Sequence, residues 1–478
     1  MRHSRRRHLR LRSLVLVAVA LFSAGSPTVL AVASLSLTEI SQDTYANSTS
    51  QHKTQVEPSS ASSGNTMVAA FQSGRFFDGG ASNITFATSA DGGATWGTGN
   101  LPGITNIDSA VNLYDRVSDP SVAFDARHNV WLISSLAIVE VPGGINGAAV
   151  LVSRSTDGGQ TWGSPVTVAA AGAGSDLDKN WTVCDNTPTS AFYGHCYTEF
   201  DDFGDGNRIK MSTSIDGGLT WGAAKNTANN ATGIGGQPVV QPNGTVIVPI
   251  ANAFETSIRA FKSTDGGHSW SRTTRIALVS DHTVAGGLRS GPLPSAAIAG
   301  RRKVYVVWQD CRFRLGCTSN DIVMSTSTDG TNWTAPVRIP IDGKKSGVDH
   351  FIPGLAADRN TWGTTAHLGL TYYFYPDAAC TFSTCELMVG FIASMDGGAT
   401  WGAPTAVTDA MTLSSLPNTN QGRMVGDYIA TAYNADGIAH GVFAVANALT
   451  SGGSDCATAT PNCDQGMYTR PPRWTGSR

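Results

Sequence analysis

The sequence predicts an all-β protein assembled from repeated units, and three observations support this fold class. One short sequence motif occurs six times along the 478 residues, at intervals of about 60 residues. The residues before each copy alternate or run apolar, as in AAVLVSRS before the second copy, which is typical of a β-strand entering a turn. Glycine is frequent (53 residues) and charged residues make up only 14%, as expected for a rigid, loop-rich β protein.

The repeated phrase has the chemistry of a turn. An aspartate followed by two glycines can accept backbone N–H groups on its carboxylate while the glycines take positive φ, and the closing tryptophan buries a large ring. We therefore interpret the phrase as a marker of the fold and not as a catalytic site. Its copies are Ser89–Trp96, Ser155–Trp162, Ser214–Trp221, Ser263–Trp270, Ser394–Trp401 and the shortened Ser327–Trp333.

The phrase S-x-D-x-G-x-T-W resembles the Asp-box of the sialidase (neuraminidase) superfamily of β-propellers. The resemblance covers roughly residues 50 to 470. It implies four-stranded blades around a central tunnel, with each Asp-box joining the third strand of a blade to the fourth. The same box also occurs in propellers without catalysis.

Short stretches upstream of each box predict the inner strands of the blades. These are Glu57–Ser59, Asp119–Val122, Lys179–Val183, Gln237–Val240, Leu293–Ala296 and Phe351–Pro353. A seventh inner strand is expected at Met424–Tyr428, followed by strands at Ala439–Ala446 and Met467–Thr469. The N-terminal stretch Leu35–Ile40 would supply the fourth strand and close the ring. We therefore predict seven blades, with six as the alternative.

The first 33 residues have the layout of a secretory signal, with an arginine-rich start, an apolar run and small residues before Ala33. Sec and twin-arginine export both stay open. Residues 34–478 are then one propeller domain, secreted, without a membrane span and expected to be a monomer. Export favours disulfides over zinc ligation for the eight cysteines, with the simplest connectivity joining neighbours. The predicted pairs are Cys184–Cys196, Cys311–Cys317, Cys380–Cys385 and Cys456–Cys463.

Sialidases grip a substrate carboxylate with three arginines, and they use a tyrosine paired with a glutamate as nucleophile and a loop aspartate as acid/base. By position, Arg75 resembles the second arginine, and Asp78 resembles the acid/base. Arg289, Arg312 and Tyr373 are further candidates for the cluster and the phenol. Two positions depart from the pattern, because Glu57 stands where an arginine is expected and Gly236 stands where the glutamate is expected.

The predicted inner strands also bring carboxylates to one end of the tunnel. Glu57, Asp119 and Asp427 would cluster there, with His350 close by. Converging carboxylates disfavour an anionic ligand, so such a ring suits a neutral sugar, a cationic group or a metal ion. A pair of them could also divide into acid and base if one pKa is raised by its neighbour.

A second acidic cluster, which includes Asp201, Asp202 and Asp205, permits a structural calcium ion, although no cofactor is required. The net charge of −3 gives no reason to expect nucleic-acid binding. We favour an exo-acting glycoside hydrolase on extracellular glycans or glycoproteins. The alternative is a non-catalytic propeller that binds glycan or protein, because propellers host many unrelated functions.

Overall fold

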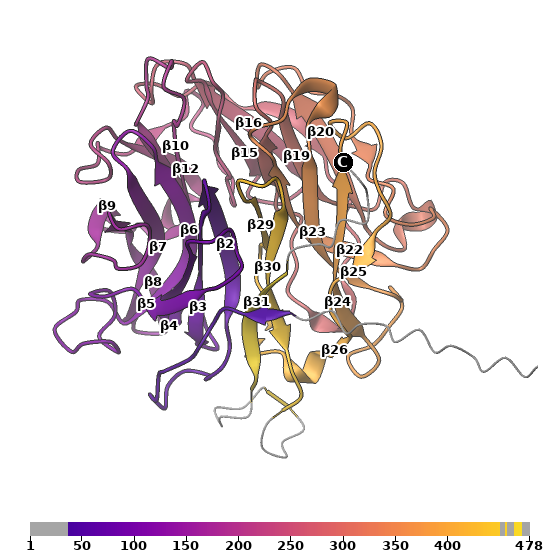
Figure 1. Ribbon diagram of the computed structural model, residues 1–478. Coiled ribbons are helices and arrows are strands. Elements are labelled where there is room, and N and C mark those ends of the chain that lie inside the picture. The colour runs from indigo at the N-terminus through magenta and orange to yellow at the C-terminus, as the bar shows by residue number, and fades with distance from the viewer. Residues whose placement is uncertain (1–36, 450–454, 457–462, 471–478) are drawn as a thin grey trace, which may run out of the picture. The chain divides into compact units, whose positions relative to one another are not determined.

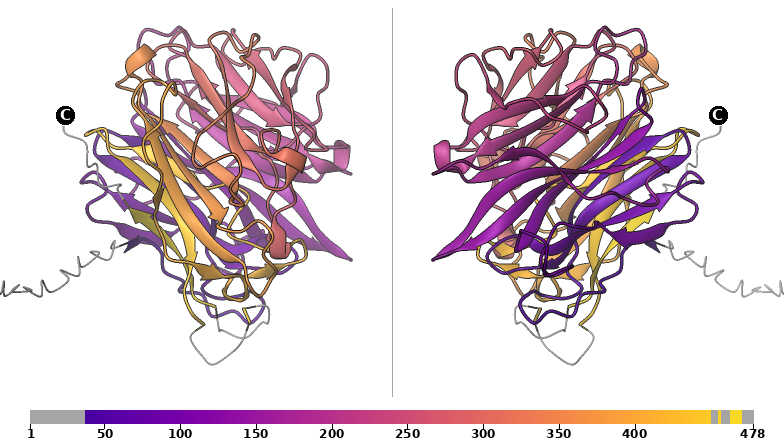
Figure 2. Two further views of the ribbon diagram at one scale, coloured as in Figure 1. Left: turned by 90° about the vertical axis from the view of Figure 1, so that its right-hand side faces the viewer. Right: turned by 90° about the vertical axis from the view of Figure 1, so that its left-hand side faces the viewer.

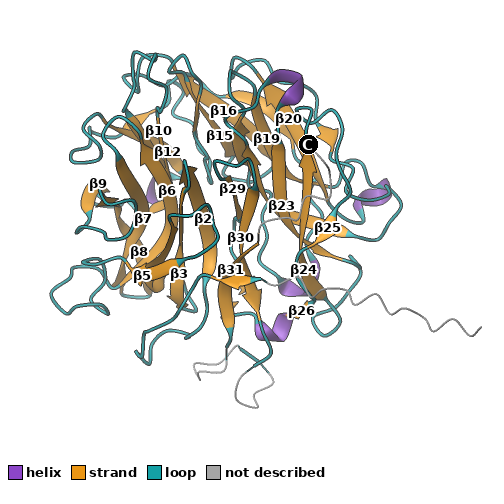
Figure 3. Ribbon diagram, in the orientation of Figure 1, coloured by secondary structure: helices purple, strands orange, loops and turns teal. Residues whose placement is uncertain are grey.

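A computed structural model of the chain describes residues 37–449, 455–456 and 463–470 (Figure 1). The predicted secretion signal, residues 1–33, lies outside the described residues. Strands make up nearly all of the regular structure, as Figure 3 shows. Within the described ranges, no helix is long and apolar enough to cross a membrane. The helices are three-residue 3₁₀ turns: η1 (Phe203–Asp205), η2 (Ala285–Gly287), η3 (Leu315–Cys317), η4 (Gly363–Thr365) and η5 (Leu413–Ser415).

The strands form antiparallel sheets in which sequence neighbours pair. The first sheet has eight strands: β2 (Val56–Ser63), β3 (Thr66–Arg75), β4 (Ala81–Ser89), β5 (Gly97–Asn100), β6 (Arg116–Asp125), β7 (Val130–Val141), β8 (Gly144–Ser155) and β9 (Val166–Ala170). The next two sheets have four strands each: β10 (Leu177–Cys184), β11 (Cys196–Asp202), β12 (Arg208–Ser214) and β13 (Lys225–Asn226), then β14 (Val239–Val240), β15 (Val246–Ala251), β16 (Ser257–Ser263) and β17 (Thr274–Leu278).

The second half of the chain also folds into antiparallel sheets made of consecutive strands (Figure 2). A four-stranded sheet contains β18 (Ser295–Ile298), β19 (Val304–Asp310), β20 (Asp321–Ser327) and β21 (Val337–Arg338). A five-stranded sheet contains β22 (Asp349–Ala357), β23 (Leu368–Tyr375), β24 (Glu386–Ser394), β25 (Thr405–Ala406) and β26 (Met411–Thr412). The last sheet contains β29 (Ala430–Tyr433), β30 (Ala439–Ala446), β31 (Gln465–Arg470) and β1 (Thr38–Glu39), and β27 (Asn418–Thr419) pairs with β28 (Gly422–Arg423).

Each Asp-box forms the turn between the third and fourth strands of its unit, as predicted. In the second box, the Asp157 carboxylate accepts the Thr161 backbone N–H at 3.0 Å and the Ser155 hydroxyl at 2.8 Å. Gly159, at φ 83°, packs on the preceding unit, where a β-carbon would lie 2.7 Å from a methyl group of Val68. Only glycine fits this approach, so the box both turns the chain and fastens one unit onto its neighbour.

The first strands of the units contact one another in cyclic order around a central tunnel: β2, β6, β10, β14, β18, β22, β29 and again β2. This arrangement confirms an all-β propeller and the predicted inner strands. The seventh inner strand is the exception, because it begins at Ala430, just beyond the predicted Met424–Tyr428. The strand β1 pairs with β31 through Thr38–Thr469 and Glu39–Tyr468.

The predicted number of separate blades was wrong. Five sheets have the size of a blade, with four or five strands each, and neither seven nor six separate blades are present among the described residues. The reason is the pairing of β4 with β6 at Ala81–Val117, which joins the first two units into one eight-stranded sheet. This long-range pair has no local signal in the sequence.

All four predicted disulfides are present and confirm the nearest-neighbour connectivity. Cys184 and Cys196 are directly opposite each other on β10 and β11, so this disulfide lies within a sheet. The other three disulfides close short loops. Every cysteine of the chain is therefore accounted for.

Candidate functional site

Irregular backbone in three inner strands aims three charged side chains at one another. Glu57, Asp119 and Lys179 have positive φ (56°, 50° and 45°), and each lies in a β-bulge near the start of its strand. A non-glycine residue in this region costs on the order of 1 kcal/mol or more, and bulges redirect side chains. The bulges therefore turn the residues of β2, β6 and β10 into a shared position at one end of the tunnel, which we call the cluster end.

The ammonium of Lys179 is the centre of this group. Its nitrogen lies 3.3 Å from Oε1 of Glu57, 3.1 Å from Oδ1 of Asp119 and 2.5 Å from Oδ2 of Asp427. All four side chains are buried, with exposed fractions of 8% or less. The predicted carboxylates thus meet, and a lysine lies at their centre. We call Lys179 and these three carboxylates the Lys179 cluster.

Two arginines border the Lys179 cluster. Arg289 donates from Nε to Oδ1 of Asp427 at 2.7 Å and from Nη2 to Oδ2, forming a bidentate pair. Arg75 is buried at the end of β3 and donates to the Gly80 carbonyl at 2.7 Å. Burial and the neighbouring charge of Arg289 lower the pKa of Arg75 to about 10. The structure therefore brings together the predicted Arg75 and Arg289, but both guanidinium groups already have acceptors.

The pKa values of Glu57 and Asp427, two neighbouring carboxyl groups of the cluster, shift in opposite directions. Burial raises the pKa of Glu57 to about 7, and Asp119 and Asp427 add to the increase against the opposing charge of Lys179. Although burial disfavours its charge, Arg289 and Lys179 hold the pKa of Asp427 far below the ordinary range. The Asp427 backbone N–H also donates to Oε1 of Glu57 at 3.3 Å. Below about pH 7, a neutral and an ionised carboxyl thus lie side by side.

The cluster end leaves almost no free space next to these groups. The pocket lined by Asp119, Lys179, Trp181, Gly236 and Tyr428 measures about 20 Å³, which is the room for about one water molecule. The ring of Tyr428 lies beneath the Lys179 ammonium, at 5.6 Å from its centroid. Burial and the surrounding carboxylates raise the pKa of Tyr428 well above its usual value, so this phenol is not activated as a nucleophile.

Gly236, where the family resemblance led us to expect a glutamate, is covered by a carboxyl group from a neighbouring strand. A β-carbon on Gly236 would lie 2.4 Å from Cδ of Glu199 on β11. Glu199 is fully buried, and burial raises its pKa well above the usual value. A glutamic acid therefore occupies this position, but it comes from β11 and is held in the neutral form.

Four predicted site residues lie away from the cluster. Asp78 pairs with Arg116, and Arg312 pairs with Asp310 at 2.6 Å. The Tyr373 hydroxyl is buried in the core, where it donates to the Ala444 carbonyl at 3.0 Å, so it cannot act as the predicted phenol. The sequence predicted His350 close to Glu57. Instead, His350 is buried against Tyr372, with 5.5 Å between the two ring centroids. Burial lowers the pKa of His350 to about 4.

The three predicted calcium ligands do not converge. Asp201 and Asp202 are consecutive in β11 and therefore point to opposite faces of the sheet. Asp201 accepts from Asn207 at 2.8 Å, and Asp205 lies near Arg208 and Lys210 on the surface. These carboxylates do not fit a shared ion. The acidic spacing in the sequence did not show that the strand would separate them.

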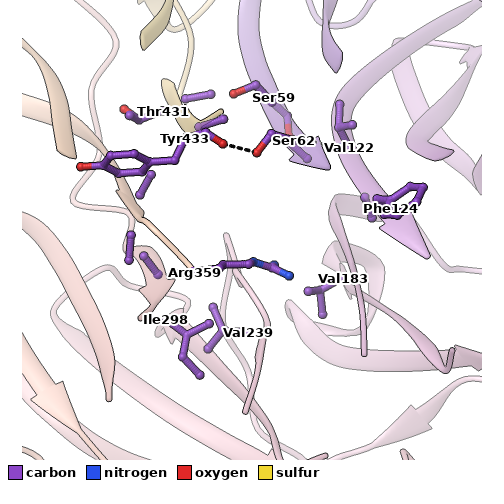
Figure 4. Close-up of a pocket in the computed structure, with 18 of the residues that line it drawn as sticks. Ser59, Ser62, Val122, Phe124, Val183, Val239, Ile298, Arg359, Thr431 and Tyr433 are labelled. Atoms are coloured by element: carbon purple, nitrogen blue, oxygen red, sulfur yellow. Dashed lines mark hydrogen bonds between the residues drawn. The ribbon is translucent and has the colours of Figure 1, made fainter. Parts of the chain in front are cut away.

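A much larger cavity opens at the other end of the tunnel, beside the Asp-box turns, and we call this the box end. It measures about 610 Å³ and is lined by the inner strands from their middle onward and by the turns that follow them (Figure 4). Hydroxyl and amide groups mix there with small apolar side chains. Examples are Ser59, Ser62, Thr431, Val183 and Val239.

Sequence reasoning missed Lys179, Tyr428 and Glu199 as members of the cluster end. For Lys179 a signal existed, because Lys179-Asn180 takes the same place in its strand as Glu57-Pro58 and Asp119-Pro120. Comparing the inner strands position by position would have placed a cation among the carboxylates. For Tyr428 the signal was its place directly after Asp427 in the predicted seventh inner strand, whereas Glu199 comes from β11, outside the inner strands, and has no comparable signal.

Part of the chain matches a known family of repeat domains. Residues 146–355 match the BNR repeat-like domain, a little under half of the chain. No curated protein matches the sequence. Among solved structures, a protein of unknown function from Dyadobacter fermentans is 15% identical, with a TM-score of 0.48 over 75% of this chain and 99% of that chain.

Two further solved structures are named as sialidases. The Hadza microbial sialidase Hz136 is 13% identical, with a TM-score of 0.45 over 88% of this chain and 66% of that chain. The intramolecular trans-sialidase from Ruminococcus gnavus is 15% identical, with a TM-score of 0.41 over 91% of this chain and 97% of that chain. With its six Asp-boxes and the match over residues 146–355, the chain contains a BNR repeat-like domain on a β-propeller fold.

Proposed function

We propose that this protein is a secreted propeller that binds an extracellular glycan in the cavity at the box end, without hydrolysing it. The observation that carries the proposal is the contrast between the two ends of the tunnel. At the cluster end, the charged groups neutralise one another around about 20 Å³ of space. At the box end, about 610 Å³ are open and lined by hydroxyl, amide and apolar groups, within the size range of small-molecule sites.

The inner strands support sugar binding in a second way. Each inner strand is the edge of its sheet on the tunnel side, apart from β6 within the eight-stranded sheet. Edge strands carry backbone N–H and C=O groups without ladder partners. Neighbouring units already satisfy some of these groups, since the Val122 and Leu355 backbone N–H groups donate to the Ser59 and Ser295 hydroxyls. The remaining backbone groups can bond the hydroxyl groups of a sugar.

The test is binding with and without a blocked cavity. We expect the mature protein to bind members of a glycan array and the same glycans in calorimetry. Val183→Trp should abolish binding, because Val183 is half-buried and lines the cavity. Val337→Trp is the matched control, since Val337 is 50% exposed on β21 and outside the cavity. Binding that survives Val183→Trp in a folded protein would place the glycan elsewhere and contradict the proposal.

A second function, glycoside hydrolysis at the cluster end, is favoured by one observation. Glu57, with a pKa of about 7, lies beside an Asp427 carboxylate whose pKa is far below normal, and such a divided pair suits acid/base catalysis. We expect any turnover of fluorogenic exo-glycosides to vanish in Glu57→Gln. The turnover should persist in Asp78→Asn, because the Asp78 carboxylate of the wild type pairs with Arg116. Loss of activity in Asp78→Asn alone would restore the role suggested by the family resemblance.

Export and ring closure are parts of the same proposal. Four disulfides in one chain are expected in an oxidising compartment, which supports secretion. We further propose that β1 closes the ring through its pairing with β31. Truncation before Gln55 would remove β1, and it should expose the edge of β31 and promote association, visible by size-exclusion chromatography.

A further inference from the structure

The cavity at the box end contains one cationic side chain among the described residues that line it. Arg359 lies in the turn after β22, and Figure 4 shows its side chain extending into the middle of the cavity. Its neighbour Asp358 is the one acidic residue of the described lining. The Asp358 carboxylate is turned away, because it lies 3.7 Å from Nδ1 of His367 and accepts the Asn360 backbone N–H. Asp358 is buried, so the Arg359 guanidinium is the exposed charge of the described lining.

Within the described part of the chain, no hydrogen bond or ion pair holds the Arg359 guanidinium. This is unusual for the arginines around the tunnel. Arg289 has two contacts with Asp427, and Arg75 donates to the Gly80 carbonyl. Arg359 is exposed to the cavity, and the surrounding protein lowers its pKa. An anionic ligand in the cavity would give this guanidinium an acceptor, and hydrogen bonds between charged groups are stronger than those between neutral groups.

The rest of the lining identifies the kind of anion. Ser62 and Thr431 line the cavity with hydroxyl groups that donate to the Tyr433 and Gly354 carbonyls and keep their oxygens as acceptors. Ser60 has a buried hydroxyl without a hydrogen-bond partner in the described residues. A planar guanidinium matches a carboxylate with two parallel hydrogen bonds. Several hydroxyl groups around one such cation suit a ligand that carries several hydroxyl groups and one carboxylate.

We propose that the box end binds a sugar acid, with Arg359 pairing to its carboxylate and the hydroxyl-rich inner strands contacting its ring. This inference rests on the proposed glycan binding in the same cavity and names the class of ligand. It differs from a site at the cluster end, where every guanidinium and ammonium has an acidic or carbonyl partner. The cavity of about 610 Å³ accommodates one sugar ring or a short oligosaccharide.

The test is calorimetric titration of the mature protein with sodium D-glucuronate. Its neutral amide, D-glucuronamide, keeps the ring and removes the charge. We expect glucuronate to bind at least tenfold more tightly than the amide, since a hydrogen bond to a charged group is worth about that factor or more. Arg359→Gln should weaken glucuronate on the order of tenfold to a hundredfold and leave the amide unchanged. Arg272→Gln, an exposed arginine outside the cavity, is the matched control and should change neither.

The other outcomes separate the two proposals. If neutral glycans bind, Val183→Trp blocks them and Arg359→Gln has no effect on glucuronate, then glycan binding stands and the sugar-acid inference is overturned. If inorganic phosphate binds more tightly than glucuronate in an Arg359-dependent way, the carboxylate assignment is wrong. If neither glycans nor glucuronate bind to the folded protein, both proposals fail. An oligosaccharide ending in glucuronate, titrated in parallel, tells a glycan terminus from a free sugar acid.

Discussion

The ammonium of Lys179 lies 2.5 Å from Oδ2 of Asp427, although 248 positions separate the two residues in the chain. The contact joins β10 to the segment that leads into β29, across the tunnel. Lys179 reaches Glu57 and Asp119 at the same time, so one side chain connects the starts of three sheets. The charged groups of the cluster end therefore stabilise the ring, whether or not a ligand binds there.

The first prediction concerns the removal of this lysine. Lys179→Met leaves three buried carboxylates without their central cation, and breaking a buried pair in this way costs about 3 to 5 kcal/mol. We expect a loss of that size in urea denaturation at neutral pH. Lys345→Met is the control, because Lys345 is exposed and should change the free energy of unfolding by less than about 0.5 kcal/mol. A loss below about 1 kcal/mol in Lys179→Met would contradict the central role of the ammonium.

The second prediction concerns pH. The folded protein binds the Glu57 proton more tightly than the unfolded chain, because the pKa rises from 4.5 to about 7. The contribution of Glu57 to the free energy of unfolding is therefore largest below pH 4.5 and is lost as the pH rises to about 7. Glu57→Gln should reduce this decline by up to about 1.4 kcal/mol per pH unit.

Denaturation series at pH 5, 6, 7 and 8 measure the effect. Glu386→Gln, an exposed glutamate on β24, should leave the slope of the wild type unchanged. Equal slopes for Glu57→Gln and the wild type would show that Glu57 titrates normally. In that case the pairing of a neutral and an ionised carboxyl, which favours hydrolysis at the cluster end, would lose its support.

The fold could be predicted because its signals are local. An Asp-box such as Ser155–Trp162 forms its hydrogen bonds within a few residues, so the sequence of one turn is enough to recognise it. The disulfides could be predicted as well, since the two cysteines of each pair are close in the chain. The pairing of Ala81 with Val117 could not be predicted, because no residue near either of them indicates that β4 and β6 of two neighbouring units form hydrogen bonds with each other.

The site could be predicted only in part, because it depends on where side chains point. Glu57, Asp119 and Asp427 meet as expected, but the sequence did not reveal that the bulge at Lys179 aims a cation between them. Tyr373 was a candidate by residue type alone. Both faces of β23 are covered, and alternation places Tyr373 in one hydrophobic core and Tyr372 in another.

The third prediction concerns the disulfide within a sheet. Replacing both Cys184 and Cys196 by alanine frees a loop of 12 residues and should cost about 3 kcal/mol. Replacing both Cys380 and Cys385, which close a loop of five residues outside the ladder of β23 and β24, should cost less. Denaturation of the two double variants under non-reducing conditions gives the comparison. A larger loss for the second pair would mean that loop length does not govern these disulfides.

The fourth prediction separates the Asp-box from the binding site. Asp157→Ala removes the acceptor of the Thr161 backbone N–H, the Thr161 hydroxyl and the Ser155 hydroxyl. Because the carboxylate is exposed, solvent replaces part of these bonds, and we expect a loss of about 1 kcal/mol. These hydrogen bonds also lower the pKa of Asp157 to about 2, so its contribution to stability should persist above pH 4 and fade below it. Glycan binding in calorimetry should be unchanged. A folded Asp157→Ala variant that no longer binds would instead make the box part of the recognition surface, and the box would then be more than a turn that fastens neighbouring units.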